Sequence, residues 1–221
     1  DQDLSEGIMN GLIGKKLGMT QIFDADGRRV AVTVIAAGPC VVVQRKTTDT
    51  DGYEAVQLGF DPQRESRLRK SEVGAYKKAG VDPHRILREF ACESGEEAAV
   101  GDTVTASVFE GTGYVDVIGT TKGRGFQGAI KRHNMGGGRQ THGGHSRRRP
   151  GSIGQCAYPG RVAKGQRMPG HMGNARVTQQ NLKLLDVRGD DNLLLVQGAV
   201  PGPNGGLVLV KKALKKTGAS S

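Results

Sequence analysis

Residues 122–149 read KGRGFQGAIKRHNMGGGRQTHGGHSRRR, and this stretch decides how the chain is organised. It lies within a longer segment, residues 117–185, that holds 13 Lys and Arg and 15 Gly but no Asp or Glu. We call residues 117–185 the acid-free segment. The formal net charge of the whole chain is +10, and the remaining residues carry 19 bases against 22 acids. The positive charge therefore belongs to this one segment, which predicts a polyanionic partner.

The acid-free segment has too few apolar side chains to form a core. Between Lys122 and Arg176 the large apolar or aromatic residues are Phe126, Ile130, Met135, Ile153, Tyr158, Val162, Met168 and Met172. These few cannot offset the entropy lost when a long Gly-rich stretch becomes ordered. We expect an extended basic arm over residues 117–185 that is ordered by its partner and is sensitive to protease when free. Residues 1–116 and 186–221 are then expected to form one globular domain.

The flanking sequences indicate a mainly β protein. Alternating or β-branched runs, with turns between them, predict strands at Leu12–Leu17, Met19–Phe23, Val30–Ile35, Val41–Gln44, Glu54–Phe60, Ile86–Ala91, Val104–Phe109, Tyr114–Ile118, Leu182–Val187, Asn192–Gln197 and Leu207–Lys212. Their short spacing favours a barrel or a sandwich over βαβ units. The best helix candidate is Ser71–Ala79, with Ser71 as its N-cap and Gly80 as its end.

The composition of the arm favours RNA as the polyanion. It contains nine Arg against four Lys, and guanidinium groups contact phosphates bidentately and stack on bases. An extended Gly-rich chain without a recognition helix fits RNA crevices better than DNA grooves. Four histidines are expected to hydrogen-bond to phosphate, ribose or bases. The candidate contacts are Lys122, Arg124, Lys131, Arg132, His133, Arg139, His142, His145, Arg147, Arg148, Arg149, Arg161, Lys164, Arg167, His171 and Arg176.

Three other kinds of site fit the segment less well. Gly123–Gly128 matches G-x-G-x-x-G, but no acid follows until Asp186, so a dinucleotide site is disfavoured. His142 and His145 form a lone H-x-x-H beside three arginines, which argues against a metal. Cys156 with a nearby histidine would lack a carboxylate to orient the base. We therefore expect no enzyme activity, cofactor, metal or small-molecule substrate. An RNA-acting enzyme centred on Cys156 and an RNA chaperone or translational regulator remain the alternatives.

The compartment is predicted from cysteines and hydropathy. Cys40, Cys92 and Cys156 are widely separated and odd in number, which argues against a disulfide framework. No apolar run approaches the ~20 residues that span a bilayer. We expect a cytoplasmic protein that does not associate with membranes.

Long stretches of the chain resemble the family of bacterial large-subunit ribosomal protein L-three. In the acid-free segment they are GTTKGRGFQGAIKRHN (119–134), THGGHSRRRPGSIGQ (141–155) and YPGRVAKGQRMPGHMGN (158–174). Outside it they are GLIGKKLGMTQIF (11–23), KKAGVDPHRILREF (77–90) and NLLLVQGAVPGPNGGLVLVKKA (192–213). The resemblance implies a translation-protein-type β-barrel with a short helical insertion and a long loop that penetrates large-subunit (23S) ribosomal RNA.

The resemblance also implies a place in the ribosome. Family members bind early in assembly, near the 3′ end of the RNA, and contact the proteins called L-fourteen and L-nineteen. Their loop tip approaches the peptidyl-transferase centre and corresponds to Gly151, Ser152, Ile153, Gly154, Gln155, Cys156 and Ala157. Arg147–Arg149 and Arg161–Arg167 would contact phosphates beside the tip, and Lys15 and Lys16 would contact RNA from the barrel. Some relatives carry a methylated Gln where this chain has Ala157, so that acceptor is missing here.

Overall fold

The structure, a computed structural model, describes residues 9–24, 26–92 and 98–216, and these form two compact units. The barrel unit comprises the residues up to Thr120 and those from Arg176 onward, and the arm unit comprises Thr121–Ala175. The acid-free segment extends beyond the arm unit at both ends, because residues 117–120 and 176–185 lie in strands of the barrel unit.

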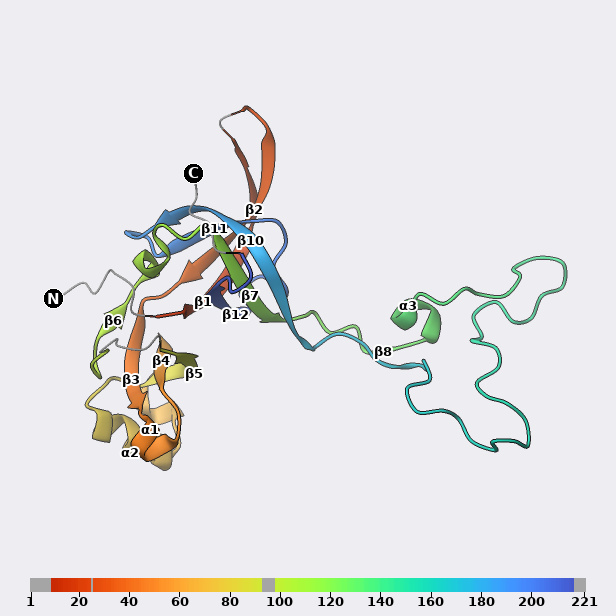
Figure 1. Ribbon diagram of the computed structural model, residues 1–221, viewed down its shortest axis with the longest axis horizontal. Helices are drawn as coiled ribbons and strands as arrows, with labels where there is room; N and C mark the ends of the chain where they lie inside the picture. The colour runs from red at the N-terminus through yellow and green to blue at the C-terminus, as the bar shows by residue number, and fades with distance from the viewer. Residues whose placement is uncertain (1–8, 25, 93–97, 217–221) are drawn as a thin grey trace. The chain divides into compact units, whose positions relative to one another are not determined.

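The barrel unit is built on a closed barrel of six antiparallel strands (Figure 1). In order around the barrel they are β1 (Gly11–Phe23), β12 (Leu207–Lys212), β7 (Tyr114–Thr120), β10 (Arg176–Arg188), β11 (Leu193–Gln197) and β2 (Arg29–Ala37). The strands after the arm unit thus pair with strands before it, since β12 lies between β1 and β7. Of the two architectures predicted from the sequence, the chain adopts the barrel.

Two of the predicted strands are a single strand. Leu12–Leu17 and Met19–Phe23 form β1, which pairs with β2 from Gly14 to Phe23, and the register shifts between Lys16 and Gly18. A β-bulge of this kind bends a strand without ending it. Gly18, which separates the two predicted strands, therefore marks a bend within β1.

A second sheet of four strands packs in the same unit. Its order is β5 (His84–Ala91), β4 (Ala55–Pro62), β3 (Cys40–Lys46) and β6 (Thr103–Val104). Phe90 of β5 and Val42 of β3 are fully buried in the same hydrophobic cluster as Leu12 and Val210 of the barrel. The two sheets therefore share one core.

One predicted strand is wrong. Val104–Phe109 was expected to be extended, but β6 ends at Val104 and Ala106–Phe109 form a 3₁₀ helix, η2. The backbone N–H of Ala106 donates to the side-chain oxygen of Asn192, at 3.3 Å. The turn buries Val108 and Phe109 together, whereas a strand would send adjacent side chains to opposite faces.

The predicted helix is present, with a different cap. Helix α2 spans Lys70–Ala79 and ends at Gly80, whose φ of +68° is the left-handed conformation that glycine favours. Ser71 lies inside the helix; at its start the carboxylate of Glu72 accepts the backbone N–H of Arg69 at 2.9 Å. A 3₁₀ helix, η1 (Glu65–Arg67), and a short helix, α1 (Thr48–Asp51), complete this part. No helix in the described part of the chain is long and apolar enough to cross a membrane.

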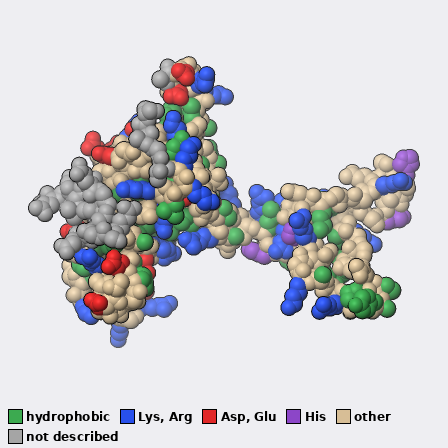
Figure 2. Space-filling view, viewed as in Figure 1, with side chains coloured by type: hydrophobic (Ala, Val, Ile, Leu, Met, Phe, Trp, Pro, Cys, Tyr) green, Lys and Arg blue, Asp and Glu red, His purple; other side chains and the backbone are tan. Residues whose placement is uncertain are grey.

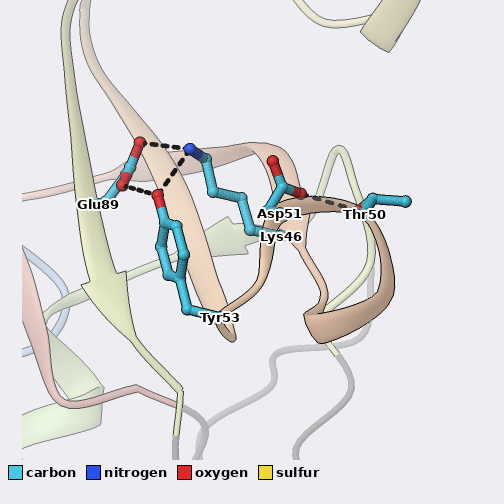
Figure 3. Close-up of polar contacts among 5 residues, drawn as sticks. All are labelled: Lys46, Thr50, Asp51, Tyr53 and Glu89. Atoms are coloured by element: carbon cyan, nitrogen blue, oxygen red, sulfur yellow. Dashed lines mark hydrogen bonds and ion pairs between the residues drawn. The ribbon is translucent and has the colours of Figure 1, made fainter.

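A surface network connects β3, β5 and the residues after α1 (Figure 3). The ammonium group of Lys46 lies 3.0 Å from Glu89 Oε1 and donates to the hydroxyl oxygen of Tyr53 at 2.8 Å. The Tyr53 hydroxyl donates in turn to Glu89 Oε2 at 2.9 Å. Hydrogen bonds from Lys46 and Tyr53 lower the pKa of Glu89, and the bonds to Tyr53 and Glu89 raise that of Lys46. The network holds the edge of the second sheet.

Candidate nucleic-acid interface

The arm unit is inserted between two strands that are neighbours in the barrel. β7 ends at Thr120 and β10 begins at Arg176, and these two residues are paired. The pairing continues beyond the strands as an irregular neck, formed by residues 121–125 and 172–175. Thr121 N–H donates to Ala175 O at 2.9 Å, and Arg124 N–H donates to Met172 O at 2.9 Å. The neck therefore keeps the two ends of a 55-residue insertion together.

Glycine is required at one position of the neck. Gly173 has a φ of +74°, and a Cβ there would collide with the carbonyl oxygen of Lys122 and lie 3.1 Å from the Cα of Gly123. The two neck strands can approach this closely only because no side chain lies between them.

A short helix closes the base of the arm unit. Helix α3 (Ala129–His133) follows the two-residue strand β8 (Phe126–Gln127), which pairs with β9 (Gly170–His171). The carbonyl oxygen of Met168 lies 2.9 Å from Arg132 Nη1 and 3.1 Å from His133 Nε2. Two of the predicted RNA contacts thus hold residue 168 against the helix. The Arg132 guanidinium keeps further donors and remains exposed.

The chain after α3 turns back closely on itself. The Cα of Gly138 faces the backbone of Ser146, and a Cβ there would lie 2.5 Å from Ser146 O. This approach brings the glycine run beside the start of Arg147–Arg149.

The cations of the arm unit are exposed and unpaired. All eleven of its Lys and Arg are exposed, and none forms an ion pair with any residue that the structure describes. In Figure 2 the visible face of this unit shows Lys, Arg and His side chains with no acidic ones. Ala129 is the one buried hydrophobic residue among 121–175, all of which are described. The arm unit is therefore held mainly by backbone hydrogen bonds and close approaches at glycines, and its cations face outward.

Every residue of the predicted tip, 151–157, is exposed. The hydroxyl of Ser152 donates to Gly154 O at 2.8 Å, which makes a local turn. A shallow hollow lies between residues 151–156 and 160–162. Tyr158, 89% exposed, and Ile153, 45% exposed, present apolar surface that can stack on or cover a base.

The two barrel lysines are engaged within the protein. Lys15 pairs with Asp61 at 2.9 Å. Lys16 is only 8% exposed, and its ammonium donates to Val200 O at 2.9 Å and to Gly202 O at 3.4 Å. The position of Lys16 in β1 explains this, because the turn after β11 covers it.

The structure offers no assembled reaction centre in its described residues. No group of three His, Cys, Asp or Glu lies close enough there to hold a metal ion. His142 and His145 are exposed, as is Cys156. Within the described part of the chain, no hydrogen bond or ion pair orients the side chain of any of these three residues.

The barrel unit carries a second group of cations that the net charge of the chain does not reveal. Residues 64–78 of the barrel unit carry six Lys and Arg against two Glu, and all six cations are exposed. A local charge count over this stretch, in place of one over the whole chain, would have found them.

Comparison with known proteins identifies relatives along almost the entire chain. A model of the family described as Ribosomal protein L3 matches residues 85–192. Large ribosomal subunit protein uL3 of Syntrophotalea carbinolica is 52% identical over 209 residues, which cover 94% of this chain and 100% of that protein. The uL3 protein of Corynebacterium jeikeium is 53% identical, over 96% of this chain and 98% of that protein. The uL3 protein of Pelotomaculum thermopropionicum is 54% identical, over 94% of this chain and 99% of that protein.

Proposed function

This chain belongs to the uL3 family of large ribosomal subunit proteins, and from that premise we propose that it binds large-subunit (23S) ribosomal RNA directly through its arm unit. It is a structural component of the large subunit in the cytoplasmic ribosome, not an enzyme. The barrel unit rests on the RNA surface, and the arm unit reaches between RNA helices and neutralises their phosphates.

The observation that carries this proposal is the absence of acidic partners for the arm cations among the residues that the structure describes. Eleven exposed Lys and Arg without an ion pair to any described residue would repel one another unless a polyanion neutralised them. Folded RNA supplies phosphates at high density, and guanidinium groups bind them bidentately. Arg147–Arg149 and Arg161–Arg167 flank the tip and supply most of these contacts.

Within the arm unit, some residues shape the chain and others contact RNA. Arg132 and His133 hold Met168 against α3, so they fix the base of the loop as well as offering donors to phosphate. The tip, residues 151–157, carries no charge, so it can approach bases closely. We place it toward the peptidyl-transferase centre, where it supplies no chemical group.

The barrel unit provides the remaining contacts. Lys15 lies at the surface and can exchange Asp61 for a phosphate, whereas Lys16 holds the turn at Val200 and acts through the shape of the barrel. Binding early in assembly, near the 3′ end of the RNA, and contacts with L-fourteen and L-nineteen complete the proposal.

The test is a binding series on the full chain and on a variant lacking residues 122–176. Large-subunit RNA and an unrelated RNA of equal length are titrated across a range of salt. If about eight phosphates are contacted, the logarithm of affinity should fall against the logarithm of salt with a slope of about −6. The deletion should remove most of the binding, and far-UV circular dichroism should confirm that the barrel strands persist. Equal binding to both RNAs, or a shallow slope, would contradict the proposal.

A further inference from the structure

The second group of cations lies on α2, on η1, which precedes it, and on the residues that immediately precede each of these helices. Figure 1 labels α2 at one end of the barrel unit, and Figure 2 shows Lys and Arg side chains projecting at that end. One of the six cations, Lys77, is paired with Glu65 at 2.9 Å. We call the other five the α2 patch: Arg64, Arg67, Arg69, Lys70 and Lys78.

Neither acid of this stretch neutralises the patch. Glu65 is taken by Lys77, and Glu72 accepts the backbone N–H of Arg69 at the start of the helix. No side chain of the α2 patch forms an ion pair with a residue that the structure describes. Asp82, the next acid along the chain, lies beyond the end of α2. The patch is therefore a concentration of unpaired positive charge, as the arm unit is.

The helix arranges part of the patch as a row. Lys70 and Lys78 are eight residues apart, which places them about 80° apart around the helix, on the same half of its surface, and about 12 Å apart along the axis. Gly74 lies midway between them, and nothing approaches within 4 Å of the place where its Cβ would stand. Lys78, in the last turn, interacts favourably with the helix dipole, but Lys70, at the first helical position, opposes it, so the stability of the helix does not account for both lysines.

The chemistry of the patch points to phosphate. Protein interfaces depend on apolar or aromatic anchors at their centre, yet no large hydrophobic side chain in residues 64–80 is exposed. The β1–β2 hairpin offers a contrast, because Met19 and Phe23 are exposed there. Cations without an apolar anchor suit the backbone of a nucleic acid, which is bound through its charge.

We propose that the α2 patch is a second ribosomal RNA contact, in which Arg67, Lys70 and Lys78 bind phosphate groups that the arm unit does not contact. The inference rests on the proposed function for the identity of the RNA. It assigns to α2 and η1 a binding role separate from that of the acid-free segment. The patch then anchors the barrel unit on RNA independently of the arm unit.

The experiment compares three variants of the full chain, each with three cations replaced by Gln. The patch variant is Arg67→Gln/Lys70→Gln/Lys78→Gln, and the arm variant is Arg147→Gln/Arg148→Gln/Arg149→Gln. The matched control, Arg28→Gln/Arg29→Gln/Arg45→Gln, changes the net charge equally, at exposed barrel-unit positions outside the patch. Affinity for large-subunit ribosomal RNA is measured across a salt series, and hydroxyl-radical footprints are recorded on each complex. Thermal unfolding checks that all three variants fold.

The patch variant should reduce the salt slope by about 2, because three phosphate contacts are lost. It should also lose RNA protection at nucleotides that the arm variant still protects, and the control should match the wild type. A patch variant with the control's salt slope and an intact footprint would overturn the inference. That result is also the one expected if the patch binds an acidic protein instead of RNA. The proposed function fails separately, if the arm variant binds as the control does.

Discussion

Replacing Gly173 with Ala is expected to weaken RNA binding by two to three orders of magnitude while the barrel unit stays folded. Gly173 is the point of closest approach in the neck of the arm unit, with a φ of +74° and the carbonyl of Lys122 where a Cβ would lie. Holding Ala at such a φ costs about 1 kcal/mol. The collision with the Lys122 carbonyl comes in addition, and it is relieved only if the two neck strands separate.

The size of the effect follows from the bonds beside Gly173. Separation of the strands breaks three of them: Arg124 N–H to Met172 O at 2.9 Å, Met172 N–H to Gly125 O at 3.0 Å and Asn174 N–H to Thr121 O at 3.2 Å. Each contributes about 1 kcal/mol. Together with the strain, the cost is about 3–4 kcal/mol, and a tenfold change in affinity corresponds to about 1.4 kcal/mol.

Gly165 supplies the matched control. Its φ is +81°, and nothing lies within 4 Å of where a Cβ would be, so Gly165→Ala introduces the strain without the collision. We expect about a fivefold loss of affinity for that variant. Filter binding to large-subunit RNA at fixed salt measures both variants, and thermal unfolding monitors the barrel unit. Equal losses for the two variants would refute the argument that the spacing of the neck matters.

Three further outcomes are expected. Lys16→Met should lower the free energy of unfolding by about 1–3 kcal/mol, because two carbonyls lose a buried donor, and should leave the salt slope of RNA binding unchanged; a flatter slope would count against the assignment. Because the pKa of Glu89 is lowered, its ionised carboxylate stabilises the fold above the ordinary value of pH 4.5, and this contribution is lost as the pH falls below that value. The free energy of unfolding of Glu89→Gln should therefore fall less steeply below pH 4.5 than that of the wild type. Burial raises the pKa of Cys40 to about 12, so a thiol reagent at pH 8 should label exposed Cys156 in the native protein and Cys40 only after unfolding; native labelling of Cys40 would show that its burial is wrong.

Most of the β architecture could be predicted because its signals are local. Alternating runs such as Val30–Ile35 lie within observed strands, and Gly80 ends α2 by a backbone conformation that glycine favours. The exception, Ala106–Phe109, is apolar enough for a strand, but the adjacent residues Val108 and Phe109 are both buried there, which a strand with one buried face would not allow. Whether the sheets formed a barrel or a sandwich depended on pairings between residues about 100 to 200 positions apart, such as Gly11 with Lys211, which local periodicity does not encode.

The candidate interface rests on residue type, and its geometry could not be predicted from the sequence. Charge segregation identified the arm cations, yet it gave no sign that Arg132 and His133 both meet the carbonyl of Met168, 36 and 35 residues away. Nor did it separate Lys15, whose ion pair with Asp61 leaves it at the surface, from Lys16, which is buried. These distinctions depend on tertiary neighbours.

The confinement of acids to the barrel unit has a physical consequence for binding. The arm unit buries one hydrophobic residue, so it has no core that fixes the conformation of its loop. A carboxylate placed among Arg147–Arg149 would therefore pair with a guanidinium and fold the loop onto itself. RNA binding would then have to break that pair before a phosphate could replace it. Without acids the arginines repel one another, so we expect the free loop to stay open to phosphates. The same reasoning applies to the α2 patch, where Glu65 and Glu72 are already engaged and leave the other cations available.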